Sequence, residues 1–321
     1  MKQTKALMLL LCISTHSFAG IPLAQANSWK IGVEGGFFTQ DSDGTGYTYD
    51  LSDVYTPSGK LVYVEPNAKF SGGLNIGYNL KNGQDINISL FLRKNNASSS
   101  NLGSEDFGTA TTRSPDSWDG ESALFANSNF SYESKELNLT FGQMFLKSSQ
   151  SSFHPYTGLA LRKVVSNQTT KYFDYEEEEG ENATVTERSK AEGIGIVVGA
   201  DLNWYFSEQW AITVDANIAF LSGKIKSSYT ADNNFGEDYY DLTAESKQSI
   251  FQQVTAKIGL SKSFMFTNQP ASMLLGYRIS GYSNAVQSHL FRDDNNDNSL
   301  VSSFSNTGYS GAYASLNLNI S

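Results

Sequence analysis

Apolar and polar residues alternate over long stretches of the chain, and this period of two predicts β-strands. From Phe70 to Leu80 the even-numbered positions are apolar or glycine, and the odd-numbered positions between them are small or polar. Asn82-Gly83 follows, a dipeptide that favours a tight hairpin turn. Alternation resumes from Ile86 to Arg93, so the pattern predicts an antiparallel pair of strands.

The same alternation predicts about ten strands in total, within a range of 8 to 12. Strong patterns recur at 194–204 and 210–220, and six further strands are predicted at 29–39, 135–146, 153–165, 252–264, 271–283 and 308–320. The connections between them alternate in length. Tight turns are predicted near 81–84, 147–152, 207–209 and 263–270, and long polar loops near 40–67, 94–130, 166–191, 230–247 and 284–307.

Alternation of this kind also fits a soluble β-sandwich or a lipocalin-like barrel. Three features favour a barrel in the outer membrane. Short turns alternate with long loops, and aromatic residues gather beside the short turns, as membrane barrels require at their interfaces. The face opposite the apolar one carries mostly glycine, serine and asparagine with lone charges, whereas a soluble barrel would expose far more lysine and glutamate. We therefore expect an all-β fold, a closed antiparallel transmembrane β-barrel with short periplasmic turns and long extracellular loops.

The N-terminus has the pattern of a secretory leader. Lys2 and Lys5 precede an apolar run over 6–13, and small residues follow it. Cleavage after Ala19 suits the short distance from the apolar run, while cleavage after Ala26 suits the A-x-A pattern, so the leader covers 1–19 or 1–26. A single barrel domain is expected over 27–321. Export through this leader would place the chain in the outer membrane of a Gram-negative bacterium.

Charge and composition narrow the function classes. The formal charge is −10, and loss of Lys2 and Lys5 with the leader makes it −12. Nucleic acid is an unsuitable partner, because phosphate binding needs a basic face. The one cysteine, Cys12, lies in the leader behind bulky Leu11, which disfavours lipid attachment. The mature chain thus has no thiol for a disulfide or a metal site, and we expect no cofactor.

At its strands the sequence resembles the Legionella-type major outer membrane protein family. The matching stretches are Phe70 to Tyr78 with the Asn82-Gly83 turn, Leu137 to Gln143, Gly193 to Gly223, and Leu275 to Tyr277 with Tyr282 and Asn284. They are short barrel motifs of moderate specificity and span about residues 68–321. The resemblance implies an abundant, pore-forming β-barrel of the outer membrane.

Lone charges on the inward face are the best functional candidates. A barrel of about eight strands is filled by its own side chains, whereas 16-stranded porins leave a water channel, so about ten strands give a narrow pore at most. The candidates either line such a pore or pair with one another and plug it. They are Glu34, Lys69, Arg93, Arg162, Asp201, Asp215, Lys257 and Arg278.

Other candidate sites are weaker. Barrel enzymes need a histidine beside serine or aspartate, but His154 follows a short turn and His289 lies in a long loop, so both are interpreted as solvated or interfacial, and we expect no enzyme. Asp293, Asn295 and Asp297 have the oxygen-rich look of a calcium loop. However, Asn298 stands where the turn needs glycine and Phe304 where it needs glutamate, so no metal site is expected.

The leading hypothesis is a small porin-like or structural major outer-membrane protein. The alternative is a surface adhesin that uses its long loops on a barrel scaffold. The expected partners are outer-membrane lipid and lipopolysaccharide, the barrel-assembly machinery, and small ions or solutes.

Overall fold

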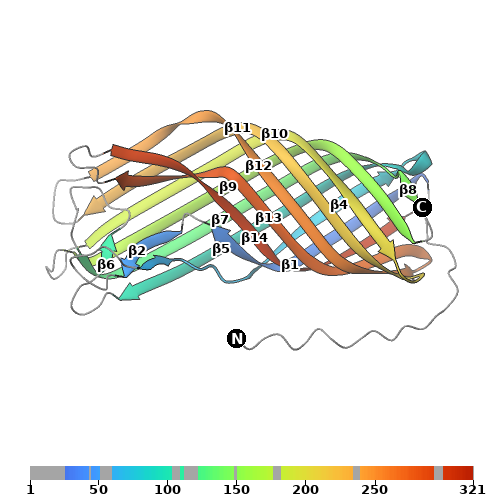
Figure 1. The fold of residues 1–321 in the computed structure, drawn as a ribbon, viewed down its shortest axis with the longest axis horizontal. Coiled ribbons are helices and arrows are strands. Elements are labelled where there is room, and N and C mark those ends of the chain that lie inside the picture. Colours follow the sequence, from blue (N-terminus) through green and yellow to red (C-terminus); the bar gives the residue numbers. More distant parts are fainter. Residues whose placement is uncertain are drawn as a thin grey trace.

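The computed structural model describes residues 26–42, 45–50, 60–102, 109–111, 122–147, 150–175, 182–233, 239–292 and 299–320. Ten long strands form the wall of a barrel (Figure 1). They are β1 (Ser28–Ser42), β4 (Lys69–Asn79), β5 (Gln84–Leu102), β7 (Ser122–Gln143), β9 (Ser151–Tyr175), β10 (Asn182–Tyr205), β11 (Trp210–Asn233), β12 (Tyr239–Phe266), β13 (Gln269–Arg292) and β14 (Ser299–Ile320). Short strands β2 (Gly46–Asp50), β3 (Lys60–Tyr63), β6 (Thr109–Thr111) and β8 (Leu146–Lys147) extend the sheet locally.

The sheet closes on itself, with every pairing antiparallel. The first strand β1 pairs with the last strand β14 from Trp29↔Ile320 to Ser42↔Thr307. Pairing of β7 with β9 completes the ring on the other side. Closure gives each wall strand two neighbours, the arrangement that satisfies backbone hydrogen bonds in lipid. The predicted fold, a closed antiparallel barrel of ten strands, is confirmed.

The residues at two short turns adopt the backbone conformation that tight hairpins require. Asn82 and Gly83 join β4 to β5 with φ angles of 63° and 76°. At the β12–β13 turn, Thr267 and Asn268 also have positive φ angles, of 45° and 65°. Two successive residues of this conformation match the right-handed twist of a hairpin, for which Asn-Gly is the preferred dipeptide. The hairpin predicted at Asn82-Gly83 is therefore confirmed.

The strands are longer than the alternation predicted, and the long loops are correspondingly shorter. Strand β10 begins at Asn182, inside the loop predicted at 166–191, and β12 begins at Tyr239, inside the loop predicted at 230–247. The remaining long loops are also partly strand, because β5, β7, β13 and β14 extend into 94–130 and 284–307. A membrane crossing needs only about 9 to 11 residues per strand. The wall therefore continues well beyond the membrane at the end of the barrel where the long connections lie.

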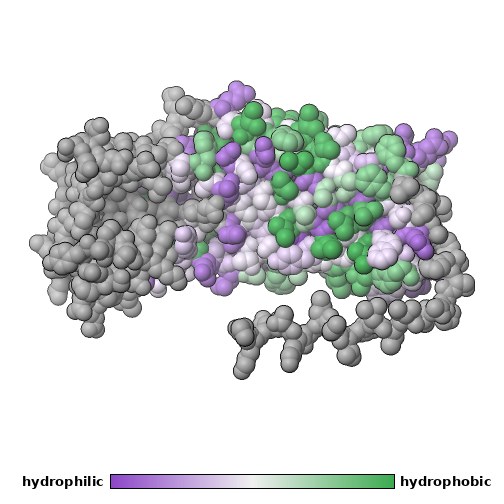
Figure 2. Space-filling model, viewed as in Figure 1, coloured by the Kyte–Doolittle hydropathy of each residue, from purple (hydrophilic) through white to green (hydrophobic). Residues whose placement is uncertain are grey.

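The polarity of the wall changes along the barrel axis. On β10 the outward residues from Ile194 to Trp204 are mainly apolar and exposed, and their inward neighbours are glycine, Val197, Asp201 and Asn203. Above Ile194 the pattern reverses, with threonine, arginine and lysine outside and buried Ala183, Val185 and Ala191 inside. Figure 2 shows hydrophobic side chains gathered over the half of the wall that carries the short turns. This half is the membrane-spanning band.

Exposed aromatic residues border this band at the short-turn end, among them Phe145, Trp204, Phe206 and Phe266. Aromatic rings are enriched at membrane interfaces because they combine an apolar body with affinity for the interfacial region. No helix among the described residues is long and apolar enough to cross a membrane.

Candidate functional site in the barrel interior

Seven of the eight candidate charges project into the barrel. Cross-strand partners point to the same side of a sheet, and Glu34 faces Gly73 and Ser315 on the inward side. The other six inward candidates are Arg93, Arg162, Asp201, Asp215, Lys257 and Arg278. Lys69 is the exception. It is the first residue of β4 and pairs with inward-facing Phe38, but its own side chain is exposed.

A network of ion pairs crosses the middle of the barrel. Arg278 on β13 bonds through Nη1 to Glu34 Oε1 at 2.9 Å and through Nη2 to Glu136 Oε2 at 2.8 Å. Lys257 Nζ lies 2.8 Å from Glu34 Oε2 and 4.0 Å from Asp215 Oδ2. The order of pairing around the ring places β7, which carries Glu136, five strands from β13 in either direction. Arg278 and Glu136 therefore join opposite walls, and both are only 4 % exposed.

Two tyrosines complete the bonding of Glu136. The hydroxyl of Tyr282 donates to Glu136 Oε1 at 2.8 Å, and that of Tyr309 donates to the same oxygen at 2.7 Å. Both tyrosines are fully buried. A buried carboxylate is tolerated only when it is paired and its remaining lone pairs accept hydrogen bonds. Glu136 meets this requirement with one guanidinium and two hydroxyls.

Aromatic rings and Arg93 fill the next layer toward the long connections. The Arg93 guanidinium lies over the rings of Tyr309 and Tyr132, at 4.6 Å and 5.1 Å from their centroids, and donates to Gln40 Oε1. Phe38 packs edge-on against Tyr309, with ring centroids 5.6 Å apart. Arginine over aromatic faces gains a cation–π attraction that strengthens as water is removed. Arg93, 2 % exposed, is held mainly by such contacts.

Arg162 has neutral partners. Its Nη2 donates to Asn138 Oδ1 at 2.7 Å, its Nη1 donates to the Leu137 carbonyl at 3.0 Å, and its Nε donates to Gln253 Oε1. Gln253 in turn donates to Ser280 Oγ at 3.0 Å. These bonds link β9 to β7, β12 and β13 across the interior.

A second polar cluster lies nearer the short-turn end. His154 Nε2 is 2.6 Å from Asp85 Oδ2, and His154 Nδ1 is 3.3 Å from Asp201 Oδ2. Beside it, the hydroxyl of Tyr156 donates to Asp215 Oδ1 at 2.7 Å. The interpretation of His154 as a solvated or interfacial histidine was wrong, because strand parity turns its side chain into the barrel between two carboxylates. The sequence signal for this placement is that His154 and inward-facing Tyr156 are alternate positions on the same strand.

Strand β13 also bends into the interior. Its pairing with β14 shifts register between Tyr282 and Val286, and Asn284 within the bulge has a φ of 60°. Val286 is buried beyond the bulge, and the Gln287 backbone N–H donates to Ser189 Oγ on β10 at 2.9 Å. Since β10 and β13 are three strands apart in the ring, this bond crosses the barrel. Bulges of this kind redirect a strand locally.

The sequence analysis missed several of these residues. Glu136, Asp85, Tyr282 and Tyr309 were not among the candidates. Glu136 lies within the strand predicted at 135–146 and falls on the same alternate positions as inward Asn138 and Thr140, so the alternation of that strand could have found it. The calcium-loop residues Asp293, Asn295 and Asp297 lie outside the described residues, and the side chain of His289 is likewise not described. Within the described ranges, no group of three or more His, Cys, Asp or Glu could hold a metal ion.

A closed antiparallel barrel with an apolar outer band and a polar interior is the architecture of an outer-membrane β-barrel protein. The sequence profile described as "Legionella pneumophila major outer membrane protein precursor" matches residues 21–320. The chain belongs to this family, and its location is the outer membrane. The family resemblance expected from the strand motifs is thereby confirmed. The comparison with curated proteins gave no match.

Three solved structures that align with this chain are distant from it in sequence. The outer membrane protease OmpT from Escherichia coli aligns with 10 % identity and a TM-score of 0.46, covering 91 % of this chain and 97 % of that one. A Pseudomonas aeruginosa FadL homologue aligns with 6 % identity and a TM-score of 0.32, covering 92 % and 90 %. The Pseudomonas putida toluene transporter TodX aligns with 7 % identity and a TM-score of 0.27, covering 92 % and 89 %. Likeness at this level assigns no activity, and the fold assignment rests on the strand pairing.

Proposed function

We propose that the protein is a structural outer-membrane barrel whose lumen is closed by its own side chains. The observation that carries this proposal is the Arg278–Glu136 pair, which joins opposite walls with both partners almost fully buried. Charges that line an open channel are solvated by its water and screened by its ions. Charges that touch across the diameter and exclude water instead form a plug.

The competing function is a narrow pore lined by the same charges. The inward cations Arg93, Arg162, Lys257 and Arg278 would then favour small anions. Three features favour the plug: the ion-pair network, the aromatic layer around Arg93, and the inward bulge of β13. Tyr309 connects the first two features, because its hydroxyl bonds to Glu136 and its ring lies against the Arg93 guanidinium.

The test is a planar-bilayer recording of refolded protein. We expect negligible current from the wild type in samples whose mobility in detergent gels confirms folding. The double variant Glu136→Gln/Arg278→Gln removes the crossing pair without leaving a lone charge, and should raise the frequency of brief openings. Lys262→Gln, on the outer wall, is the matched control and should stay silent. Steady, ohmic conductance from folded wild type would reject the plug and restore the pore.

A non-enzymatic role is part of the proposal. Both ring nitrogens of His154 lie against carboxylates, of Asp85 and Asp201, which leaves neither nitrogen to activate a hydroxyl. This arrangement supports a structural histidine. Residual hydrolase activity that disappears in His154→Gln would contradict it.

Surface recognition is a second candidate, favoured by the extension of the wall beyond the membrane. Above the apolar band the interior becomes partly apolar, with buried Val185, Ile225 and Tyr229, and the outside becomes polar. That half is built like a soluble protein and would hold the connecting loops on a rigid base. Cells whose barrel lacks residues 103–108 should then adhere less to a cultured animal-cell layer while the barrel still folds.

Lipid surrounds the protein in the outer membrane; lipopolysaccharide and the barrel-assembly machinery are proposed as further partners.

A further inference from the structure

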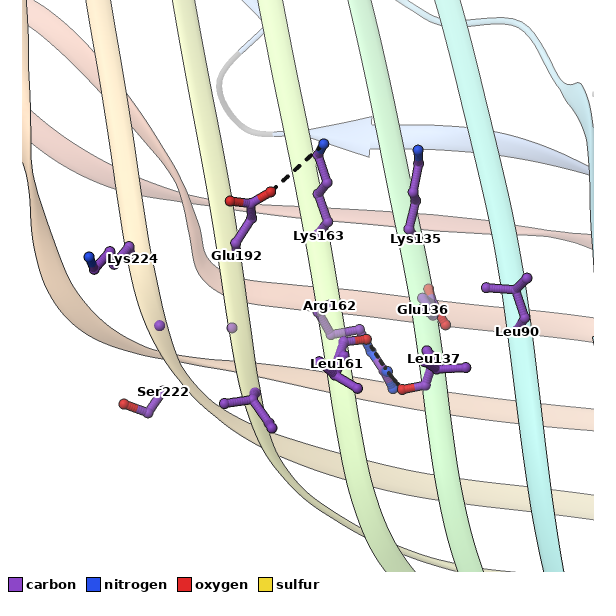
Figure 3. A pocket seen from close by; sticks show the side chains of 13 residues that line it. Leu90, Lys135, Glu136, Leu137, Leu161, Arg162, Lys163, Glu192, Ser222 and Lys224 are labelled. Atoms are coloured by element: carbon purple, nitrogen blue, oxygen red, sulfur yellow. Dashed lines mark hydrogen bonds and ion pairs between the residues drawn. The ribbon is translucent and has the colours of Figure 1, made fainter.

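The outer wall carries a dense group of lysines on five neighbouring strands, β5, β7, β9, β10 and β11. We call it the lysine surface, and it consists of Lys94, Lys135, Lys163, Lys190, Lys224 and Lys226, together with Glu133 and Glu192. One cross-strand row runs through Lys135↔Lys163, Lys163↔Glu192 and Glu192↔Lys224. Figure 3 shows these four side chains following one another across adjacent strands.

The lysine surface lies at the edge of the membrane band. The next outward row on the same strands is Leu90, Leu137, Leu161, Ile194 and Ser222, which is apolar except at its end. The two rows border an open hollow of about 480 Å³ on the outside of the barrel (Figure 3). The lysines are on the side of the long connections, which in this class of protein is the extracellular side. They are thus at the height of the headgroups of the outer leaflet.

The charges of this surface do not cancel. Six lysines face two glutamates in a protein whose formal charge is −10. Glu133 pairs with Lys135 at 2.9 Å, and Glu192 pairs with Lys190 at 2.8 Å and Lys163 at 3.7 Å. Lys94, Lys224 and Lys226 make no ion pair with any residue that the structure describes.

Like charges also stand directly opposite one another. Lys135 is the cross-strand partner of Lys163, and Lys190 is that of Lys226, with all four side chains on the outer face. Like charges in directly opposed positions destabilise a sheet. An anion bound between the two strands would reduce this repulsion, and phosphate is an anion that lysine binds as a point charge.

From this arrangement we infer that the lysine surface binds the lipid A phosphates of lipopolysaccharide. The lysines bind the phosphates, and the apolar row beneath them contacts the acyl chains. Lipopolysaccharide is the outer-leaflet lipid that presents phosphates directly above several acyl chains, which fits a cationic row above a leucine row. A free anion would contact the lysines but not the apolar row beneath them. The inference rests on the location in the outer membrane and is independent of the plug.

The test is titration of deep-rough lipopolysaccharide, in EDTA and zwitterionic detergent, into refolded full-length protein by calorimetry. The variant is Lys135→Gln/Lys163→Gln/Lys224→Gln. The matched control is Lys30→Gln/Lys81→Gln/Lys262→Gln, which removes three exposed lysines from the short-turn end. A lysine near an anionic lipid surface contributes a factor of about five, so the variant should bind about 100-fold more weakly and the control like wild type. Glu192→Gln, which frees Lys190 and Lys163, should bind more tightly.

Three further arms identify the ligand. Dephosphorylated lipopolysaccharide should bind weakly, and added NaCl should weaken binding of the intact lipid to wild type but hardly to the triple variant. Phosphatidylglycerol micelles and inorganic phosphate should both bind much less tightly than lipopolysaccharide. Equal binding by the triple variant and the control, or equal affinity for phosphatidylglycerol or phosphate, would overturn the inference. Since the arms with dephosphorylated lipopolysaccharide, phosphatidylglycerol and inorganic phosphate use wild-type protein alone, the inference stays testable even if the triple variant fails to fold.

Discussion

The costs of removing Arg278 and Glu136 one at a time should add up to more than the cost of removing both together. Arg278 makes two charge-assisted hydrogen bonds, to Glu34 and to Glu136, each with a net value of about 1.5 to 3 kcal/mol. Its guanidinium also lies 3.9 Å from the centroid of the Phe91 ring. Removing one partner of a buried pair generally costs about 3 to 5 kcal/mol, because the other charge is left uncompensated.

The two single variants should differ, because the remaining partners differ. After Arg278→Gln, Glu34 keeps Lys257 at 2.8 Å, but the hydrogen-bond partners that Glu136 keeps among the described residues are the neutral hydroxyls of Tyr282 and Tyr309. After Glu136→Gln, Arg278 still has Glu34 at 2.9 Å. We therefore expect about 5 kcal/mol for the arginine variant and about 3 kcal/mol or less for the glutamate variant. The double variant should cost less than their sum by about 0.5 to 3 kcal/mol.

The assay is urea unfolding in detergent, followed by tryptophan fluorescence and by gel mobility. Lys163→Gln serves as the control, because its exposed ion pair with Glu192, at 3.7 Å, should contribute less than about 1 kcal/mol. If the costs of Arg278→Gln and Glu136→Gln simply add, the two groups do not interact, and the account of a crossing pair fails.

Two further predictions concern the wall. Val214→Arg, at an outward position in the apolar band, should cost about 2 to 4 kcal/mol and impair assembly, whereas Asp215→Asn, its inward neighbour, should assemble normally; equal assembly yields of the two variants would mean that the faces are reversed. The wild type should migrate differently in detergent gels before and after boiling, because a closed sheet has no edge from which to unfold, and identical mobility would contradict closure.

The number of strands could be predicted from the sequence because the membrane imposes a strong contrast on each crossing. Between Ile194 and Trp204 every outward residue except Ala200 is large and apolar. Every inward residue in this range except Val197 is small or polar. Above the membrane this contrast weakens and reverses. Thr184, Thr186 and Arg188 face outward there, while Val185 faces inward beside buried polar Glu187. A search for apolar outward positions therefore ends most strands too early and assigns their upper parts to loops.

The candidate site could be predicted only in part. The face of the sheet on which a side chain lies depends only on its position along its own strand. The alternation therefore correctly predicted that Glu34, Arg162 and Arg278 point inward. Which of them meet depends on ring closure, which brings together strands five places apart, such as β7 and β13. No spacing along the chain encodes the contact between Glu136 and Arg278. The bulge at Asn284 is similarly hidden, since asparagine adopts the left-handed conformation in many ordinary turns.

One inward row lies at the boundary between the two halves of the wall. It runs through Phe91, Glu136, Arg162 and Gly193, between the outward leucine row and the outward lysine row. A slip of β7 by one residue would exchange its faces, because side chains alternate with a period of two. Glu136 would then face lipid, and Lys135 would enter the interior beside Arg278, where a like charge is strongly unfavourable. The ion pairs inside and the lysines outside therefore specify the same register. Charges at this height stabilise the correct pairing even where each ion pair alone contributes little.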